Sequence, residues 1–258
     1  MYLLFLILIT SLIISDTSLN SNLSDSLTDK DNDNMEYLYI GNWPENPIDS
    51  NYSSNIFIDC PNGIGCDCKQ NNDCVNNNCQ KTPKGNFCTP KNGDKFPNFI
   101  GIDQFEEYIP IHTFANQNKY ILVEMGASWC TPCHLLSNWI SYKDNEIQEM
   151  KWWKNDYNDI YDMIHNNEIY YITVLYEDEF KDNASFDTVY QWYNNYPDDL
   201  IPILADENKF LHRWIKPTGI PAIILLDESL QIVEFSTRGI NKAFDKLLQI
   251  KNTNKKNK

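Results

Sequence analysis

Cys130 and Cys133 stand three positions apart in the segment Trp129-Cys130-Thr131-Pro132-Cys133. Two cysteines at this spacing at the start of a helix lie on one face, close enough to close a small disulfide loop. The free N–H groups and the dipole of a helix N-terminus stabilise a thiolate, which lowers the pKa of the first thiol. The pattern therefore predicts a redox dithiol in which Cys130 is the nucleophile.

The neighbouring residues fit this chemistry. Cys133 would lie one turn deeper and attack the mixed disulfide that Cys130 forms with a substrate. Pro132 suits a first helical turn, where its missing N–H would have no helical partner. Glu124 interrupts the apolar run at 120–125, and burial there would raise its pKa and let it exchange a proton with Cys133. The alternative is that the carboxylate of Glu124 reaches solvent or pairs with a lysine.

From residue 96 onward, apolar strands alternate with amphipathic helices, which is typical of an α/β domain. The apolar run at 120–125 predicts a central buried strand, which leads through a turn at 126–128 into the helix that begins near Cys130. Further strands are expected at 169–176, 200–204, 222–226 and 231–235, the last two as a hairpin; further helices are expected at 150–164, 186–193, 209–215 and 242–250, with a polar tail at 251–258.

Two landmarks resemble the thioredoxin superfamily. Residues 124–133, EMGASWCTPC, are similar to the strand, turn and helix that carry its active site, and residues 219–227, GIPAIILLD, are similar to its second landmark. The segment at 96–99 and the pair Arg238-Gly239 resemble the TlpA-like branch of exported oxidoreductases and their peroxiredoxin relatives. The spacing between Cys133 and the strand at 169 is long for this family, which suggests an added helix around 152–153.

The resemblance implies a thioredoxin-like fold, with a central mixed sheet flanked by helices. It implies a cis bond between Ile220 and Pro221, with Pro221 facing the dithiol and the backbone of Ile220 pairing with a substrate chain. Within this family, Trp129, Thr131 and Pro132 would flank the substrate. The implied activity is exchange with substrate proteins that carry disulfides or thiols, with the TlpA-like branch favouring reduction and an upstream thiol partner supplying electrons.

A second cysteine group precedes this domain. It lies in a stretch with almost no apolar residues, so disulfides must hold it together. Six cysteines allow 15 pairings, and the sequence does not choose among them. A metal site would require paired C-x-x-C spacing or a histidine within the cluster, and neither is present. The structural cysteines are Cys60, Cys66, Cys68, Cys74, Cys79 and Cys88.

The N-terminus and the overall charge bear on location and partners. The apolar run at 3–14 resembles a signal peptide, which is either cleaved or kept as a membrane tether. Together with the cysteine cluster it predicts export to a periplasm, cell envelope or extracellular space. A net charge of -15 disfavours nucleic-acid binding.

The sequence predicts four divisions of the chain. They are 1–15, signal peptide or anchor; 16–59, disordered spacer and irregular segment, with a short strand at 56–58; 60–90, disulfide-rich module; and 91–258, thioredoxin-like domain. No cofactor or metal is predicted.

Three other functions compete with the oxidoreductase. Cys130-Thr131-Pro132-Cys133-His134 also matches the attachment signature of c-type haem, although an α/β pattern with an Ile-Pro landmark favours a redox dithiol, with His134 beside it. A peroxidase would carry Thr or Ser three residues before its cysteine, where this chain has Ala127. A binding module with a merely structural disulfide is the third alternative.

Overall fold

The protein is described by a computed structural model, which defines residues 39–44 and 60–256. The expected signal peptide, the strand at 56–58 and most of the expected spacer lie outside the described residues. Trp43, inside the spacer range, is buried, and its indole N–H donates to Asp103 at 2.8 Å. Within the described ranges, no helix is both long and apolar enough to cross a membrane.

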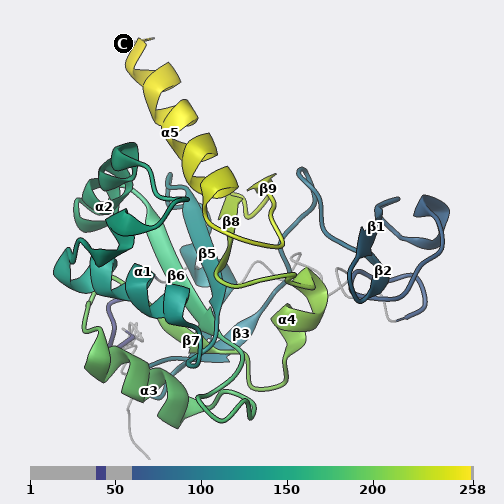
Figure 1. The fold of residues 1–258 in the computed structure, drawn as a ribbon, viewed down its shortest axis with the longest axis horizontal. Coiled ribbons are helices and arrows are strands. Elements are labelled where there is room, and N and C mark those ends of the chain that lie inside the picture. Colours follow the sequence, from purple (N-terminus) through teal and green to yellow (C-terminus); the bar gives the residue numbers. More distant parts are fainter. Residues whose placement is uncertain (1–38, 45–59, 257–258) are drawn as a thin grey trace, which may run out of the picture. The chain divides into compact units, whose positions relative to one another are not determined.

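A seven-stranded mixed sheet forms the centre of the domain, in the order β4-β3-β7-β6-β5-β8-β9 (Figure 1). β5 runs parallel to β6 and antiparallel to β8, and all six of its residues are buried. A strand that is apolar except for Glu124 is suited to this central position because helices cover both of its faces. The strands are β3 (Ile100–Ile102), β4 (Tyr108–Pro110), β5 (Ile121–Gly126), β6 (Tyr170–Leu175), β7 (Ile203–Ala205), β8 (Ala222–Leu226) and β9 (Ile232–Glu234).

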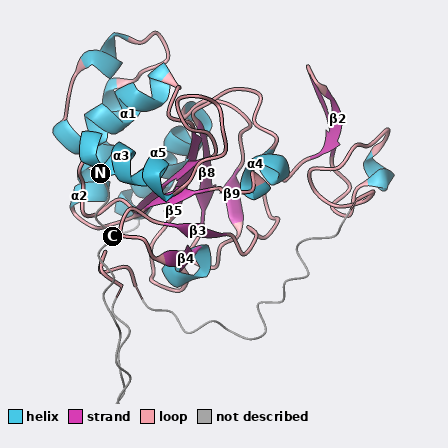
Figure 2. Cartoon of the chain, turned by 90° about the horizontal axis from the view of Figure 1, so that it is seen from below, coloured by secondary structure: helices cyan, strands magenta, loops and turns pink. Residues whose placement is uncertain are grey.

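The helices form layers on the two faces of this sheet (Figure 2). α1, α2, α3 and α5 lie together on one side, where aromatic rings pack between them; the ring centroids of Trp139 in α1 and Tyr161 in α2 lie 5.6 Å apart. α4 lies on the other side, where Trp214 packs edge-on against Phe96. The helices are α1 (Thr131–Tyr142), α2 (Asn158–His165), α3 (Phe186–Asn195), α4 (Phe210–Ile215) and α5 (Asn241–Lys256), with 3-10 turns η3 (Ile111–Phe114), η4 (Glu146–Glu149) and η5 (Asn155–Tyr157).

Two helix predictions were wrong in their extent. The helix expected at 150–164 begins only at 158, because Trp153 is buried between Trp139 and Tyr157 and the backbone at Lys154 is extended. The expected polar tail is helical as far as Lys256. The prediction of a central mixed sheet flanked by helices is confirmed.

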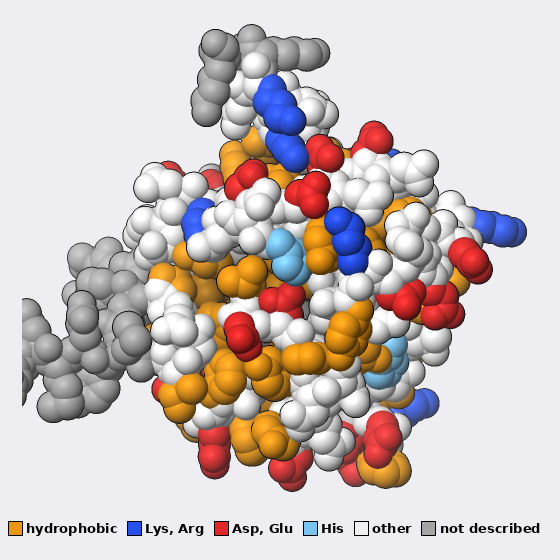
Figure 3. All heavy atoms as spheres, turned by 90° about the vertical axis from the view of Figure 1, so that its left-hand side faces the viewer, with side chains coloured by type: hydrophobic (Ala, Val, Ile, Leu, Met, Phe, Trp, Pro, Cys, Tyr) orange, Lys and Arg blue, Asp and Glu red, His pale blue; other side chains and the backbone are white. Residues whose placement is uncertain are grey.

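The disulfide-rich region before the sheet is also confirmed. It contains a small hairpin, β1 (Cys79–Thr82) and β2 (Gly85–Cys88), and a 3-10 turn, η2 (Asn71–Asp73). On the face of the molecule drawn in Figure 3, acidic, basic and apolar side chains are intermixed, so this face does not carry a block of a single charge.

Candidate active site

The two cysteines of the motif lie at the N-terminus of α1 and are joined by a disulfide. Cys130 is the residue that caps the helix, and its Sγ accepts a hydrogen bond from the N–H of Cys133 at 3.2 Å. That N–H is one of the donors that a helix leaves without an internal partner. A thiolate on Cys130 would therefore receive both this hydrogen bond and the favourable end of the helix dipole.

The two sulfur-bearing residues differ in access. Cys130 is 2% exposed and lines a groove of about 460 Å³, whereas Cys133 is fully buried and does not line it. Thr131 and Pro132 form the same wall as Cys130. Of the two sulfur-bearing residues, only Cys130 thus lines the groove.

The opposite wall of the groove comes from the segment before β8. Ile220 lies there, and the bond between Ile220 and Pro221 is cis. Pro221 and Ile220 also face Pro132 across an adjoining groove of about 300 Å³. The sheet order, the dithiol at the head of α1 and the cis proline across from it belong together in one known architecture. The fold is thioredoxin-like.

Comparisons with solved structures find thioredoxin-like proteins at low sequence identity. The thioredoxin domain of a thiol-disulfide oxidoreductase from Bacteroides vulgatus is 17% identical, with a TM-score of 0.43, and the match covers 63% of this chain and 99% of that one. A thioredoxin-like protein from Bacteroides caccae is 13% identical, with a TM-score of 0.44 and coverage of 62% and 49%. A thiol peroxidase from Chromobacterium violaceum is 14% identical, with a TM-score of 0.44 and coverage of 65% and 89%.

No protein-family model matches the chain, and no curated protein matches it. Identities and TM-scores at this level establish neither an activity nor a substrate.

Glu124 lies beneath the dithiol and is fully buried. Burial raises the pKa of its carboxyl to about 7, against the smaller opposing effect of hydrogen bonds to Oε2 from Tyr171 at 2.8 Å and Thr173 at 3.4 Å. The other oxygen, Oε1, has no hydrogen-bond partner among the described residues. The solvent-reaching alternative for Glu124 is therefore wrong, because its carboxyl is enclosed in the sheet.

Gly126 lies between this carboxyl and the second cysteine. A Cβ added at Gly126 would be 3.4 Å from the Sγ of Cys133 and 3.5 Å from the Oε1 of Glu124. Because glycine has no side chain, these two groups face a common space. The unpartnered oxygen is thus directed to the region where a proton on Cys133 has to arrive or leave.

Trp129 forms the exposed shoulder of the groove, with 40% of its surface accessible. Its indole N–H donates to Oε2 of Glu177 at 2.8 Å, and Lys209 binds the other oxygen at 2.7 Å. The Nζ of Lys181 lies 5.5 Å from the centre of the indole ring. These contacts fix the orientation of a large apolar side chain at the mouth of the groove.

His134 points away from the disulfide. One ring nitrogen lies 2.6 Å from the carbonyl oxygen of Ser128 and the other lies 2.7 Å from the hydroxyl of Tyr196. The ring also packs against Trp192. Both nitrogens are therefore used in holding α1 to α3 and to the turn before it.

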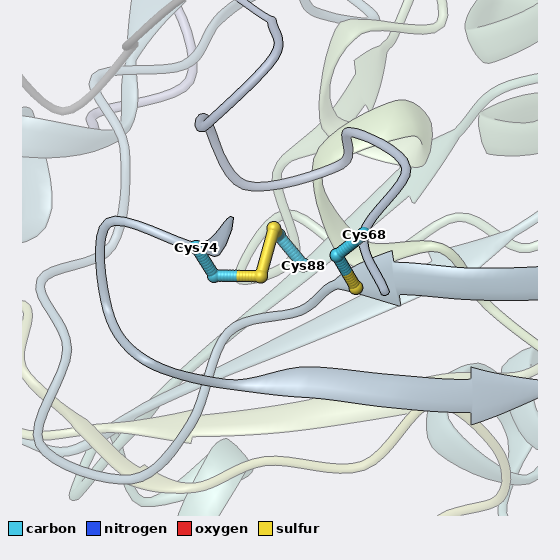
Figure 4. Close-up of side chains that lie close together, drawn as sticks. All are labelled: Cys68, Cys74 and Cys88. Atoms are coloured by element: carbon cyan, nitrogen blue, oxygen red, sulfur yellow. A yellow bond between two sulfur atoms is a disulfide. The ribbon is translucent and has the colours of Figure 1, made fainter. Parts of the chain in front are cut away.

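The structure pairs the six cysteines of the module as Cys60–Cys66, Cys68–Cys79 and Cys74–Cys88. The sulfurs of Cys68, Cys74 and Cys88 lie within 4.8 Å of one another (Figure 4). A metal would need thiolates, and these sulfurs are all in disulfides. Their proximity is the packing of two disulfides, which provides the small core that the module's sequence lacks.

Trp152 lines the groove with Pro132, as the long spacing after Cys133 led us to expect for a segment beside the active site, although this segment is a turn and not a helix. Two other residues near the dithiol, His212 and Lys84, line the groove that contains Cys130 and were not identified from the sequence. No sequence signal points to them, because each lies far along the chain from the motif and reaches it only through the fold.

Proposed function

We propose that this chain is an exported thiol-disulfide oxidoreductase that acts on the disulfides of substrate proteins, in the direction of reduction. The observation that supports it most directly is the unequal access of the two sulfurs. Cys130 opens into a groove whose far wall is the cis peptide of Ile220, while Cys133 is shielded directly behind it.

In this reaction the thiolate of Cys130 attacks one sulfur of a substrate disulfide, and the other substrate sulfur leaves as a thiolate that takes up a proton. The thiolate of Cys133 then attacks Cys130, which releases the second substrate thiol and closes the disulfide of α1. Two electrons pass from the dithiol to the substrate. Glu124 accepts the proton that Cys133 loses.

The proposal requires a partner on each side. An upstream dithiol must reduce the Cys130–Cys133 disulfide after each cycle, by the same two exchange steps in reverse order. The backbone of Ile220 is the group that pairs with the substrate chain, in the manner of an added strand. Export is supported by the three further disulfides at 60–88, since such bonds persist in oxidising compartments.

A binding module with a structural disulfide is the alternative of a different class. It is weakened by the groove at Cys130, since a disulfide with only a structural role has no need of an open approach to one sulfur. The haem alternative requires an available ring nitrogen on His134, and both nitrogens are engaged by Ser128 and Tyr196.

The test is the reduction potential of the Cys130–Cys133 pair, measured by equilibration in thiol buffers and alkylation of free thiols. We expect a reversible couple above about -300 mV, the region in which catalytic rather than structural disulfides lie. Cys133→Ser should accumulate a mixed disulfide with a substrate peptide, because the resolving sulfur is gone. Cys130→Ser is the matched control and should accumulate none, because Cys133 is buried. A pair that stays oxidised in every buffer would move the assignment to the binding module.

A further inference from the structure

Three hollows surround the dithiol and share their walls. The groove of about 460 Å³ at Cys130 shares Lys84 and His212 with a smaller apolar hollow of about 160 Å³. It shares Pro132 and Ile220 with the hollow of about 300 Å³ on its other side. Together they form one continuous depression that passes Cys130, and we call it the dithiol groove.

The dithiol groove has a charge opposite to that of the chain. Its described lining residues include Lys84, Lys216 and Arg238, and none of them is Asp or Glu. The chain as a whole has 36 acidic and 21 basic residues. Burial lowers the pKa of His212 to about 4, so this ring adds no charge at neutral pH.

The acid beside the groove is already compensated. Glu177 receives the ammonium of Lys209 at 2.7 Å and the indole N–H of Trp129 at 2.8 Å. Its partners lower the pKa of its carboxyl in spite of its partial burial. A substrate segment in the groove would therefore meet lysine and arginine without facing an unpaired carboxylate of the lining.

The cysteine-rich module provides one of these cations. Lys84 lies in the turn between β1 and β2. In the same hairpin, the ring centroid of Phe87 lies 4.4 Å from the Nζ of Lys216. At Gly65, φ is +92° and an added Cβ would lie 2.4 Å from the carbonyl oxygen of Arg213, so the module's backbone packs closely on α4. Just after the module, the backbone N–H of Gly93 donates to the carbonyl oxygen of Ile232 at 2.8 Å, which ties the segment that follows the module to β9.

We infer that the cysteine-rich module completes the substrate site and, through Lys84 with Lys216 and Arg238, selects protein segments that carry Asp or Glu beside the reactive disulfide. The inference rests on the proposed function, since it names the substrate class of the same groove. It gives the three structural disulfides a purpose: they hold a hairpin with little apolar content rigid enough to form a wall. The carboxylates of the substrate would pair with the cations while its sulfur reaches Cys130.

The test uses three synthetic peptides with the same disulfide, flanked by Asp, by Asn or by Lys, and the reduced full chain. At low ionic strength we expect the Asp peptide to be reduced about tenfold faster than the Lys peptide, with the Asn peptide between them. At high salt the three rates should converge, because exposed charges are screened. Equal rates at low salt, with all three peptides reduced, would overturn the inference and leave the oxidoreductase intact. Reduction of no peptide would instead contradict the proposed function.

Two variants locate the effect. Lys84→Gln should reduce the ratio of Asp-peptide to Lys-peptide rates severalfold, whereas Lys69→Gln makes the same change of charge in the module outside the grooves and should leave the ratio as it is. Equal changes in both variants would show that net charge, and not the groove, sets the preference.

Discussion

Replacing Glu124 by Gln removes the buried carboxyl beneath the dithiol while keeping its size. The oxygen that accepts from Tyr171 and Thr173 is retained, and the amide nitrogen takes the place of the oxygen without a partner. Any cost of that exchange does not depend on pH. The difference in stability between the two proteins should therefore vary with pH only through the ionisation of Glu124.

The magnitude follows from the pKa. Burial raises it from 4.5 to about 7 in the folded protein, so the native state holds the proton more tightly than the unfolded chain does. Each factor of ten in proton affinity corresponds to about 1.4 kcal/mol, which gives about 3 kcal/mol. The wild type has its full stability below pH 4.5, loses this amount as the pH rises toward 7, and loses no more from this group above 7. The Glu124→Gln variant has no carboxyl at this position and should not lose this part of its free energy of unfolding as the pH rises.

The assay is urea unfolding of the oxidised proteins between pH 4 and 8.5, with the free energy of unfolding compared at each pH. We expect the stability of Glu124→Gln relative to wild type to rise by about 3 kcal/mol across that range, nearly all of it below pH 7. A relative stability that stays constant would refute the reasoning, since it would mean that the carboxyl has an ordinary pKa and is hydrated in the native state.

Three further outcomes are expected. Gly126→Ala should change the free energy of unfolding by less than about 1 kcal/mol, because the added methyl makes ordinary van der Waals contacts. The same variant should release mixed disulfides about tenfold more slowly in stopped-flow assays, because the methyl fills the space that proton transfer needs. The double variant Cys74→Ser, Cys88→Ser opens a loop of 14 residues, which should cost about 3 kcal/mol and make residues 60–90 the first site of limited proteolysis. Trp139→Ala should cost about 3 to 5 kcal/mol in urea unfolding, because the ring is fully buried against other aromatic side chains.

The parts of the fold that follow from local pattern could be predicted. The apolar run at 120–125 became β5, and the hairpin expected at 222–226 and 231–235 became β8 and β9 with the expected antiparallel pairing. Such elements are recognisable because a buried strand and a tight turn each require particular residues over a short stretch.

The parts that depend on contacts between distant residues could not be predicted. The start of α2 is set by Trp153, whose ring packs between Trp139 and Tyr157 and overrides the helical pattern. The disulfide pairing was open because all six cysteines lie in a segment without secondary-structure signals, and β1 pairs with β2 over only four residues. In the candidate site, the motif residues were identifiable, but Lys84 and His212 reach the groove only through tertiary packing.

In the proposed reaction, the division of roles between the two sulfurs follows from where each one lies. A thiolate on Cys130 would be stabilised by the helix N-terminus, and Cys130 lines the groove through which a partner can approach. Cys133 is enclosed, and an unpaired charge in such surroundings is costly, so its thiolate needs a base close by at the moment of attack. A carboxyl with a pKa of about 7 on the far side of Gly126 can accept that proton and return it near neutral pH. The same burial that destabilises the ionised form of Glu124 therefore suits it to both directions of the exchange.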